Sequence, residues 1–409
     1  MGLNVVVRRL GRLLRLAVSV PLALVVVLVS RILGPLYVVR FGAMKSDRVG
    51  HFALETELTL AEQEVGIRPR PRRGADVWYV PRPVSNAALA RIWRRAVRVW
   101  PAWLMAAVHR VNAATPGASR HTVPTSSSTV LDVHTLLDEV PARVALTDGE
   151  RARGAAALER LGVPRGAPIV PIILRDGAFT NAAFPGKDLS YHDYRNCDID
   201  DLKESATYLA EQGYAVLRMG AVVEKPFVVD HPMVIDYASS GERTEFLDVY
   251  VGAVCDFCVS DGLGYASIPA LFRRPNVFVS FTPFHAFYSS RTDDIGILKW
   301  MADADSGAPV TLSEIVARGA VHLTSSAGYA ERRLVPVANG PEDALALVQE
   351  VVARRRGTWR ISAEDDALQA RFWSRYALAL GAQRDRLHGE FRARIGAEFL
   401  RRYRDLWDA

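Results

Sequence analysis

Short apolar runs with polar neighbours recur through the second half of the chain and predict buried strands. Segments with apolar residues at helical spacing separate these runs, and residues 242–254 are one example. Strands that alternate with helices in this way indicate parallel βαβ units. The runs interpreted as strands are 169–174, 214–217, 234–237, 257–259 and 276–281.

The first half of the chain repeats the pattern less regularly. A strand is predicted at 36–41 and a helix at 51–64, joined by a polar loop that holds two glycines. This order suggests the start of a Rossmann-like domain, but the loop GAMKSDRVG lacks the GxGxxG fingerprint, so a nicotinamide dinucleotide is not indicated. A short strand is predicted at 77–80, and a helical pattern at 86–108 is broken at Pro101.

The N-terminal segment is apolar and basic. Four arginines precede a charge-free stretch, 16–30, which is shorter than the ~20 residues that cross a bilayer as a helix. Four interpretations stay open: a signal-peptide core, a mismatched transmembrane helix, a monotopic anchor in the cytoplasmic leaflet, and a buried helix of a soluble fold. We favour a membrane-associated segment with the rest of the chain at the cytoplasmic face. The four arginines are Arg8, Arg9, Arg12 and Arg15.

Together these elements predict an α/β protein with two Rossmann-like domains. A hydrophobic membrane-associated segment occupies 1–34, and the two domains occupy 35–165 and 166–345. Residues 346–409 form a helical tail that is expected to pack across both domains.

Composition narrows the range of partners. The 409-residue chain has a net charge of +6, and arginine supplies all but five of its 51 basic residues. A basic balance favours anionic partners such as lipid or sugar nucleotide, while the absence of nucleic-acid-binding motifs argues against nucleic acid. Of the three cysteines, Cys255 and Cys258 have CxxC spacing, but on a strand they would point to opposite faces. We interpret both as core residues.

A glycine turn follows the predicted strand 257–259. Gly262 and Gly264 can adopt backbone angles that other residues avoid, and Ser267 fits the cap of a helix that continues through Pro269. Free N–H groups at the start of such a helix can bind phosphate. The alternative is an ordinary connection between a strand and a helix.

Charged residues follow two other predicted strands. Arg175 and Asp176 come after 169–174, and Arg218 comes after 214–217. Open α/β sheets bind ligands at the carboxyl ends of their strands, although a salt bridge would also explain each arginine. The acids at 198–201 are interpreted as the start of a helix, and no metal site is expected.

Five motifs resemble those of a family of bacterial glycosyltransferases found among surface-polysaccharide genes. This family has the GT-B architecture of two Rossmann-like domains, and a more distant similarity is to protein O-fucosyltransferases. The resemblance implies that 35–165 binds the acceptor and that 166–345 binds a nucleotide-sugar donor. The motifs are DRVGHFALETEL (47–58), LRDGAF (174–179), YRNCDID (194–200), GYAVLRMG (213–220) and the stretch 235–272.

The resemblance also implies an activity and a set of site residues. A sugar would pass from the donor to a glycan or lipid-linked acceptor in envelope polysaccharide or glycolipid synthesis, with no metal or other cofactor. An acid at Asp261, where the family tends to have a small or amide residue, would repel a phosphate unless it points away or binds ribose hydroxyls. The expected donor contacts are Arg175, Arg218, Gly220, Asp261, Gly262, Gly264 and Ser267, and the candidate bases are His51, Glu55 and Asp176.

A second hypothesis belongs to another functional class. The chain could be a non-catalytic, membrane-tethered scaffold that binds a nucleotide sugar or a partner enzyme. Such a scaffold would bind donor without releasing nucleoside diphosphate.

Overall fold

The structure is a computed structural model that describes residues 2–125, 130–183 and 186–408, without the side chains of residues 2–16, 183 and 408. The chain divides into two compact units. Unit 1 comprises residues 1–130 and 143–145, and unit 2 comprises residues 131–142 and 146–409. The division falls near residue 145 because the helix α6 (Asp148–Arg160) packs on α9 (Glu245–Val254) of unit 2.

Unit 1 is built on one parallel strand pair. Strand β1 (Val38–Ala43) pairs with β2 (Gly74–Tyr79), with Val38 opposite Gly74. Apolar side chains of both strands pack against α1 (Gly2–Leu33) and α4 (Ala102–Ala113). The other two helices are α2 (Val49–Glu64) and α3 (Ala87–Ala96), and the predicted break between α3 and α4 at Pro101 is confirmed.

The predicted layout of two Rossmann-like domains is not confirmed. Within the described residues of unit 1 the only sheet is the β1–β2 pair, which is much smaller than a doubly wound sheet. Helix α1 runs through Pro21 without ending. No helix in the described part of the chain is both long enough and apolar enough to span a bilayer.

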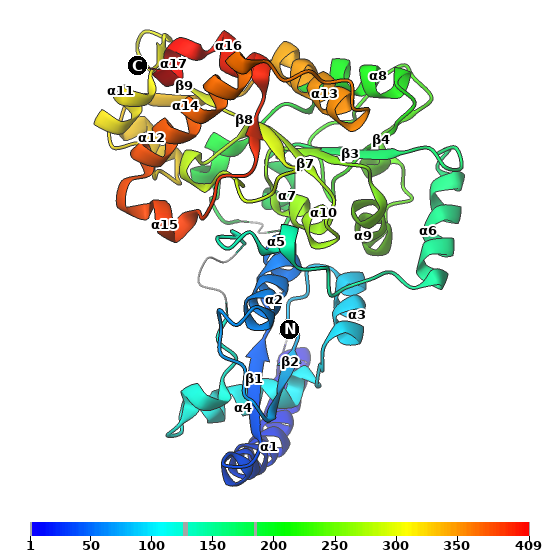
Figure 1. The fold of residues 1–409 in the computed structure, drawn as a ribbon. Helices are drawn as coiled ribbons and strands as arrows, with labels where there is room; N and C mark the ends of the chain where they lie inside the picture. The colour runs from blue at the N-terminus through cyan, green and yellow to red at the C-terminus, as the bar shows by residue number, and fades with distance from the viewer. Residues whose placement is uncertain (1, 126–129, 184–185, 409) are drawn as a thin grey trace. The chain divides into compact units, whose positions relative to one another are not determined.

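Unit 2 contains a seven-stranded parallel sheet, which confirms the α/β class (Figure 1). Its spatial order is β12-β8-β7-β6-β3-β4-β5, and every neighbouring pair is parallel. The strands are β3 (Ile169–Ile173), β4 (Ala215–Arg218), β5 (Val234–Ile235), β6 (Cys258–Ser260), β7 (Asn276–Phe281), β8 (Ile295–Leu298) and β12 (Arg394–Ile395).

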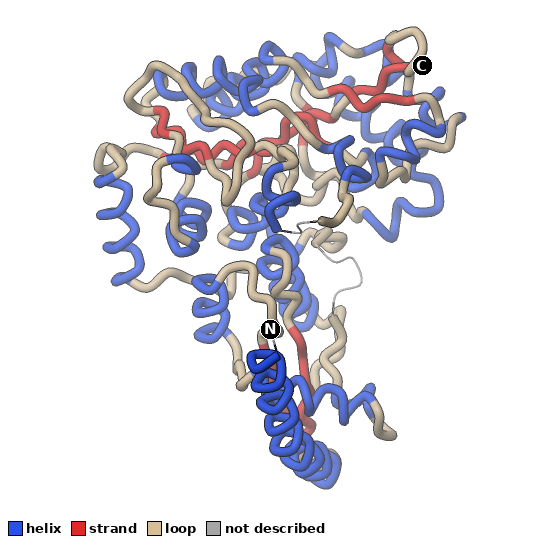
Figure 2. Tube along the Cα trace, turned by 180° about the vertical axis from the view of Figure 1, so that it is seen from behind, coloured by secondary structure: helices blue, strands red, loops and turns tan. Residues whose placement is uncertain are grey.

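Helices cover both faces of this sheet, as Figures 1 and 2 show. Helices α8 (Lys203–Glu211) and α13 (Pro341–Arg355) pack together on one face, while α9 and α10 (Ser267–Leu271) pack together on the other. The remaining helices of unit 2 are α5 (Leu136–Glu139), α7 (Ala178–Ala183), α11 (Leu312–Ala317), α12 (Ser326–Glu331), α14 (Ala363–Leu380), α15 (Arg384–Leu387), α16 (Ala397–Arg402) and α17 (Arg404–Asp408).

A small antiparallel sheet in unit 2 has no counterpart in the sequence analysis. Its order is β10-β9-β11, formed by β9 (Trp300–Asp303), β10 (Pro309–Val310) and β11 (Leu334–Val337). The predicted helical tail belongs to unit 2, where α16 packs on α13 and α14. These contacts do not test whether the tail packs across both domains.

Candidate functional site

The carboxyl ends of β3 and β6 meet through the carboxylate of Asp261. These strands are neighbours in the sheet. Asp261 is buried, and its two oxygens accept the backbone N–H groups of Arg175 at 3.0 Å and Leu263 at 3.1 Å. Burial raises the pKa of Asp261, while the nearby Arg195 opposes the rise. The carboxylate therefore holds two strand-end loops together.

The glycine turn after β6 differs from the predicted phosphate cradle. The N–H of Gly262 donates to Ser260 Oγ at 3.3 Å, so this amide already has a partner. Ser267 does not cap the helix, because a 3₁₀ turn, Gly264–Ala266, precedes α10 and Ala266 occupies the N-cap position. That prediction for Ser267 is wrong. Gly264 is exposed at the start of the 3₁₀ turn.

Packing within the protein explains why two of the predicted donor contacts, Gly220 and Gly262, are glycine. Gly262 has a φ of +83°, and a Cβ there would lie 2.2 Å from the ring of Phe281. At Gly220 a Cβ would lie 2.3 Å from Val223 Cγ1. Both positions therefore require glycine without a ligand, and their role in donor binding stays a prediction.

Arg175 has an unsatisfied guanidinium group at the end of β3. One terminal nitrogen donates to Thr180 Oγ1 at 3.2 Å, while the buried Nε has no hydrogen-bond partner among the described residues. Burial lowers the pKa of Arg175, and the positive charge of Arg195 lowers it further. A buried donor without a partner costs free energy, so this N–H group is available for an acceptor from a ligand.

The loop that carries Arg195 is fixed beside Arg175. The N–H of Cys197 donates to the backbone oxygen of Arg175 at 2.9 Å. The buried Lys299 Nζ donates to the backbone oxygens of Tyr194 at 3.1 Å and Asn196 at 2.7 Å, on either side of Arg195. Within the described chain, the side chain of Arg195 makes no hydrogen bond or ion pair, although its backbone oxygen accepts from Cys197 Sγ at 3.5 Å.

These groups form what we call the strand-end cluster: Arg175, Arg195, Asp261, Tyr288 and Lys299. Burial raises the pKa of Tyr288, and the Arg195 charge opposes the rise. The cluster contains three cationic side chains and one buried carboxylate. Two of the cations, Arg175 and Arg195, repel each other. Neighbouring guanidinium groups with free donors suit an anion such as phosphate.

Arg218, the other predicted arginine, has a partner within the protein. It is 2 % exposed, and its NH1 lies 3.4 Å from Asp236 Oδ1, just after β5. The salt bridge that the sequence analysis held as the alternative is thus present. None of the contacts of Arg218 within the described residues is shared with Arg175, so the structure does not join them as a pair, and a donor contact for Arg218 stays a prediction.

Asp176 has a structural role. Its Oδ1 accepts the N–H of Ala178 at 3.0 Å, at the start of α7, and its Oδ2 accepts the N–H of Glu224 at 2.9 Å. Both carboxylate oxygens are therefore engaged by backbone. This arrangement does not favour Asp176 as a base.

The other two candidate bases, His51 and Glu55, contact each other on α2 of unit 1. His51 Nδ1 lies 3.2 Å from Glu55 Oε2, and Lys45 Nζ lies 3.4 Å from the same oxygen. The side chain of Glu55 is 7 % exposed and that of His51 is 26 % exposed. A carboxylate that holds Nδ1 orients the imidazole and leaves Nε2 to exchange a proton.

The acids at 198–201 form ion pairs. Asp198 caps the 3₁₀ turn Ile199–Leu202, as the sequence predicted. Lys225 Nζ lies 2.5 Å from Asp198 Oδ1 and 2.7 Å from Asp200 Oδ2. Across the described residues, no three acidic, histidine or cysteine side chains are grouped as metal ligands.

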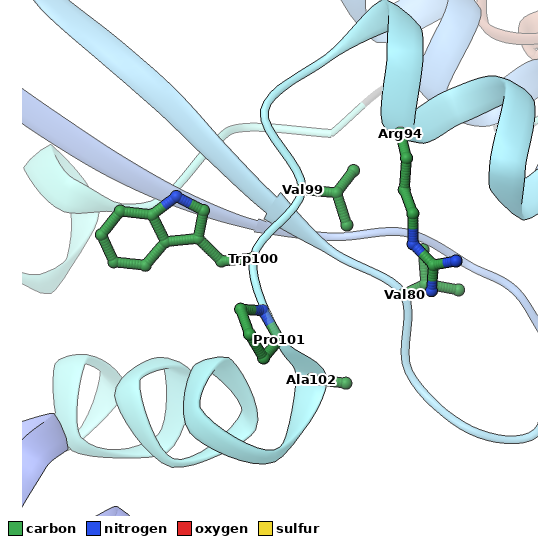
Figure 3. A pocket seen from close by; sticks show the side chains of 6 residues that line it. All are labelled: Val80, Arg94, Val99, Trp100, Pro101 and Ala102. Carbon is green, nitrogen blue, oxygen red and sulfur yellow. The ribbon is translucent and has the colours of Figure 1, made fainter.

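Unit 1 also contains a pocket of about 270 Å³ (Figure 3). Arg94 from α3 is its only charged lining residue, and in Figure 3 its side chain extends towards Val80. The other lining residues are apolar, so the pocket offers one cation and no acid–base pair. They are Val80, Val99, Trp100, Pro101 and Ala102.

The site residues predicted from the sequence do not include Arg195, Tyr288 or Lys299. Arg195 lies in the motif YRNCDID, so the resemblance contained a signal for it. Lys299 is one of only five lysines in an arginine-rich chain, and this rarity is a signal that composition alone could have given. Nothing in the pattern marks Tyr288.

Comparison with known proteins gives structural neighbours at low similarity. No family model and no curated protein sequence matches the chain. A glycosyl transferase family 9 protein from Veillonella parvula has a TM-score of 0.42 and 10 % identity, over 77 % of this chain and 97 % of that chain. The ADP-heptose lipopolysaccharide heptosyltransferase II of E. coli has a TM-score of 0.37 and 12 % identity, over 78 % and 99 %. The E. coli heptosyltransferase WaaC, with ADP-2-deoxy-2-fluoro heptose, has a TM-score of 0.30 and 15 % identity, over 63 % and 92 %. Each of these TM-scores lies below 0.5, so only the contacts within this chain support the candidate site.

Proposed function

We propose that the chain is a glycosyltransferase that moves a sugar from a nucleotide-sugar donor to a glycan or lipid-linked acceptor. The observation that carries the proposal is the strand-end cluster, in which Arg175 and Arg195 lie close enough to repel and the buried Arg175 Nε has no partner in the described chain. Two like charges with free donors are stabilised by an anion that lies between them. The motifs shared with bacterial glycosyltransferases indicate which anion: the diphosphate of the donor.

The chemistry follows from this assignment. The bond between the sugar and the donor diphosphate breaks, and a bond forms between the sugar and an acceptor oxygen. Negative charge grows on the leaving diphosphate, and the guanidinium groups of Arg175 and Arg195 stabilise it. The acceptor hydroxyl gives up its proton to a base, and His51, whose Nδ1 contacts Glu55, stays a predicted candidate for that base. Arg195 is the proposed donor contact beside Arg175, and the contact from Arg218 stays a prediction.

Arg195→Ala tests the donor site, because Arg195 has no hydrogen-bond partner within the described residues that the change would orphan. Thermal-shift and calorimetric titrations with UDP-, GDP-, dTDP- and ADP-sugars should identify one donor that raises the melting temperature of the wild type. The variant should bind this donor about 10- to 100-fold more weakly, the range for hydrogen bonds to a charged group.

Arg165→Ala is the matched control. Arg165 is an exposed arginine of unit 2 that pairs with Glu159 at 2.8 Å, away from the strand-end cluster. It should leave donor affinity unchanged. Equal donor affinity in the wild type and in Arg195→Ala would remove the cluster from the donor site.

The scaffold hypothesis is favoured by one observation. Asp261 and Ser260 already occupy backbone N–H groups at the ends of β3 and β6, and Arg218 is paired with Asp236. A site with these groups engaged could bind a nucleotide without turnover. Release of nucleoside diphosphate in the presence of the identified donor separates the two, because a scaffold would bind the donor and release none.

A further inference from the structure

We propose that unit 1 docks on an anionic lipid surface through the exposed side of α1 and the arginines around it. The proposal is independent of the glycosyltransferase assignment, because it rests on unit 1 alone. The docking is peripheral: the helix lies in the interface between headgroups and acyl chains.

In the part of α1 whose side chains are described, residues 17–33, the protein covers only one side of the helix. Ala23 and Val27 are buried in the core that α1 shares with α4 and the strand pair, and Ser19 and Ser30 are buried on the helix as well. Val26 is half-buried against that core, and the remaining described apolar residues of the helix are mostly open to solvent, with Leu24 at 53 % and Leu28 at 60 % exposure. The exposed apolar residues of α1 are Val18, Val20, Leu22, Leu24, Val25, Leu28, Val29, Ile32 and Leu33. Contiguous apolar surface of this kind marks an interaction site.

The apolar surface continues beyond α1. Leu36 and Tyr37, just after the helix, are 74 % and 41 % exposed. Trp103, on the helix α4 that packs against α1, is 50 % exposed. Exposed Trp and Tyr rings next to aliphatic surface are typical of the boundary between membrane and water.

The net charge of unit 1 indicates that an anionic partner covers this surface. Unit 1 has 20 Lys and Arg residues and six Asp and Glu residues, a net charge of +14, which leaves −8 for unit 2 from the chain total of +6. Residues 1–46 and 77–130 contain no acid at all. Anionic lipid headgroups attract such a segment, and each basic residue near the surface adds to the attraction.

Arginines lie directly beside the apolar surface. The exposed Arg120 donates to the backbone oxygen of Gly34 at 2.7 Å, at the end of α1. Arg73 is exposed as well, and its backbone oxygen accepts the N–H of Val38 at 3.0 Å, next to Tyr37. Arg110 is exposed on α4. A second copy that docked through its own unit 1 would bring a further +14 against this surface, which disfavours a symmetric dimer as its cover.

The test is co-sedimentation of the full chain with vesicles. The chain should bind vesicles that contain phosphatidylglycerol more tightly than vesicles of phosphatidylcholine alone, and added salt should weaken the difference. The double variant Leu24→Asn with Leu28→Asn removes two exposed leucines from α1 and should weaken binding at least about a hundredfold, since each leucine that inserts contributes more than a factor of ten.

A matched control is the double variant Val228→Asn with Leu378→Asn, which removes two apolar residues of unit 2 that are 71 % and 74 % exposed. It should bind vesicles as the wild type does. Circular dichroism should show both variants folded. Absence of vesicle binding, or equal binding by the α1 variant, would overturn the proposal. So would light scattering that shows a dimer lost only in the α1 variant, because the surface would then be covered by a second copy.

Discussion

At the scale of single residues, Asp261 decides how the strand-end cluster is assembled. Each of its oxygens accepts a different backbone N–H group, from Arg175 and from Leu263. Its charge also faces the cations of the cluster, since Arg195 and Lys299 both lower its pKa against the effect of burial. The carboxylate therefore stabilises the loops and, at the same time, competes with any anion that the arginines would bind.

Asp261→Asn should separate these two effects. An amide can accept only one of the two N–H groups, so the free energy of unfolding should fall by about 1–3 kcal/mol. Donor affinity should rise, because the cations lose their internal counter-charge. Chemical denaturation and calorimetric titration measure the two quantities. A variant that loses both stability and affinity would show that Asp261 contacts the donor itself, as the sequence analysis had considered for the ribose hydroxyls.

Gly262→Ala should destabilise the protein by more than its backbone angle alone explains. The change places a Cβ 2.2 Å from the Phe281 ring at a φ of +83°, so strain at a positive φ adds to overpacking, for a loss of about 2–4 kcal/mol. Gly213→Ala is the control, because its φ is +90° and no atom lies within 4 Å of the new Cβ. Equal losses in the two variants, measured by denaturant unfolding, would mean that Phe281 moves aside freely.

At the scale of elements, close packing between α6 and α9 reverses the usual preference for alanine over glycine. A Cβ at Gly154 on α6 would lie 2.3 Å from the ring of Tyr250 on α9. Gly154→Ala should therefore lower the melting temperature, with a cost of about 1–3 kcal/mol. Gly149→Ala, on the same helix with open space around it, should be neutral or stabilising by up to about 1 kcal/mol. If both changes stabilise, α6 is not packed on α9 as described.

Elements whose signals are local could be predicted from the sequence. Strand β7 occupies the predicted residues 276–281, where four of the six residues are apolar and all six are buried. Helix α6 begins at a local cap, where Thr147 and Glu150 form a capping box. Both signals lie within a few residues of the element they define.

Elements and contacts that depend on distant parts of the chain could not be predicted. Strand β8 includes Gly296, which interrupts its apolar run, and it pairs with β12 from the other end of unit 2. Arg195 is held in place by Lys299, whose partner Tyr194 lies 105 positions away in the sequence. The salt bridge between Arg218 and Asp236 likewise depends on the pairing of β4 with β5, which brings the two residues together. Position at a strand end is visible in a sequence, but the partner of each charge is not.

At the scale of the whole molecule, the net charge of +6 is the sum of two opposite net charges, +14 in unit 1 and −8 in unit 2. Unit 2 also buries carboxyl groups. Burial raises the pKa of Asp248 and of Asp294 to about 6. Both carboxyl groups make the free energy of unfolding fall as pH rises, because the folded state holds their protons at a pH where the unfolded chain has released them.

Asp294→Asn should reveal this effect as a change with pH. Between the ordinary carboxyl pKa of 3.8 and about 6, the folded state binds more protons than the unfolded state, so the free energy of unfolding falls as pH rises. The asparagine does not titrate, so the variant lacks this pH dependence of the free energy of unfolding. It can still accept the N–H of Asn276, which lies 2.8 Å from Asp294 Oδ1. The stability of the variant relative to the wild type should therefore increase by about 2 kcal/mol from pH 4 to pH 7. Burial lowers the pKa of His285 to about 4, which acts in the opposite sense on both proteins and cancels in the difference. Denaturant titrations at a series of pH values measure the difference, and a flat line would show that Asp294 is ionised in the folded state as readily as in the unfolded chain.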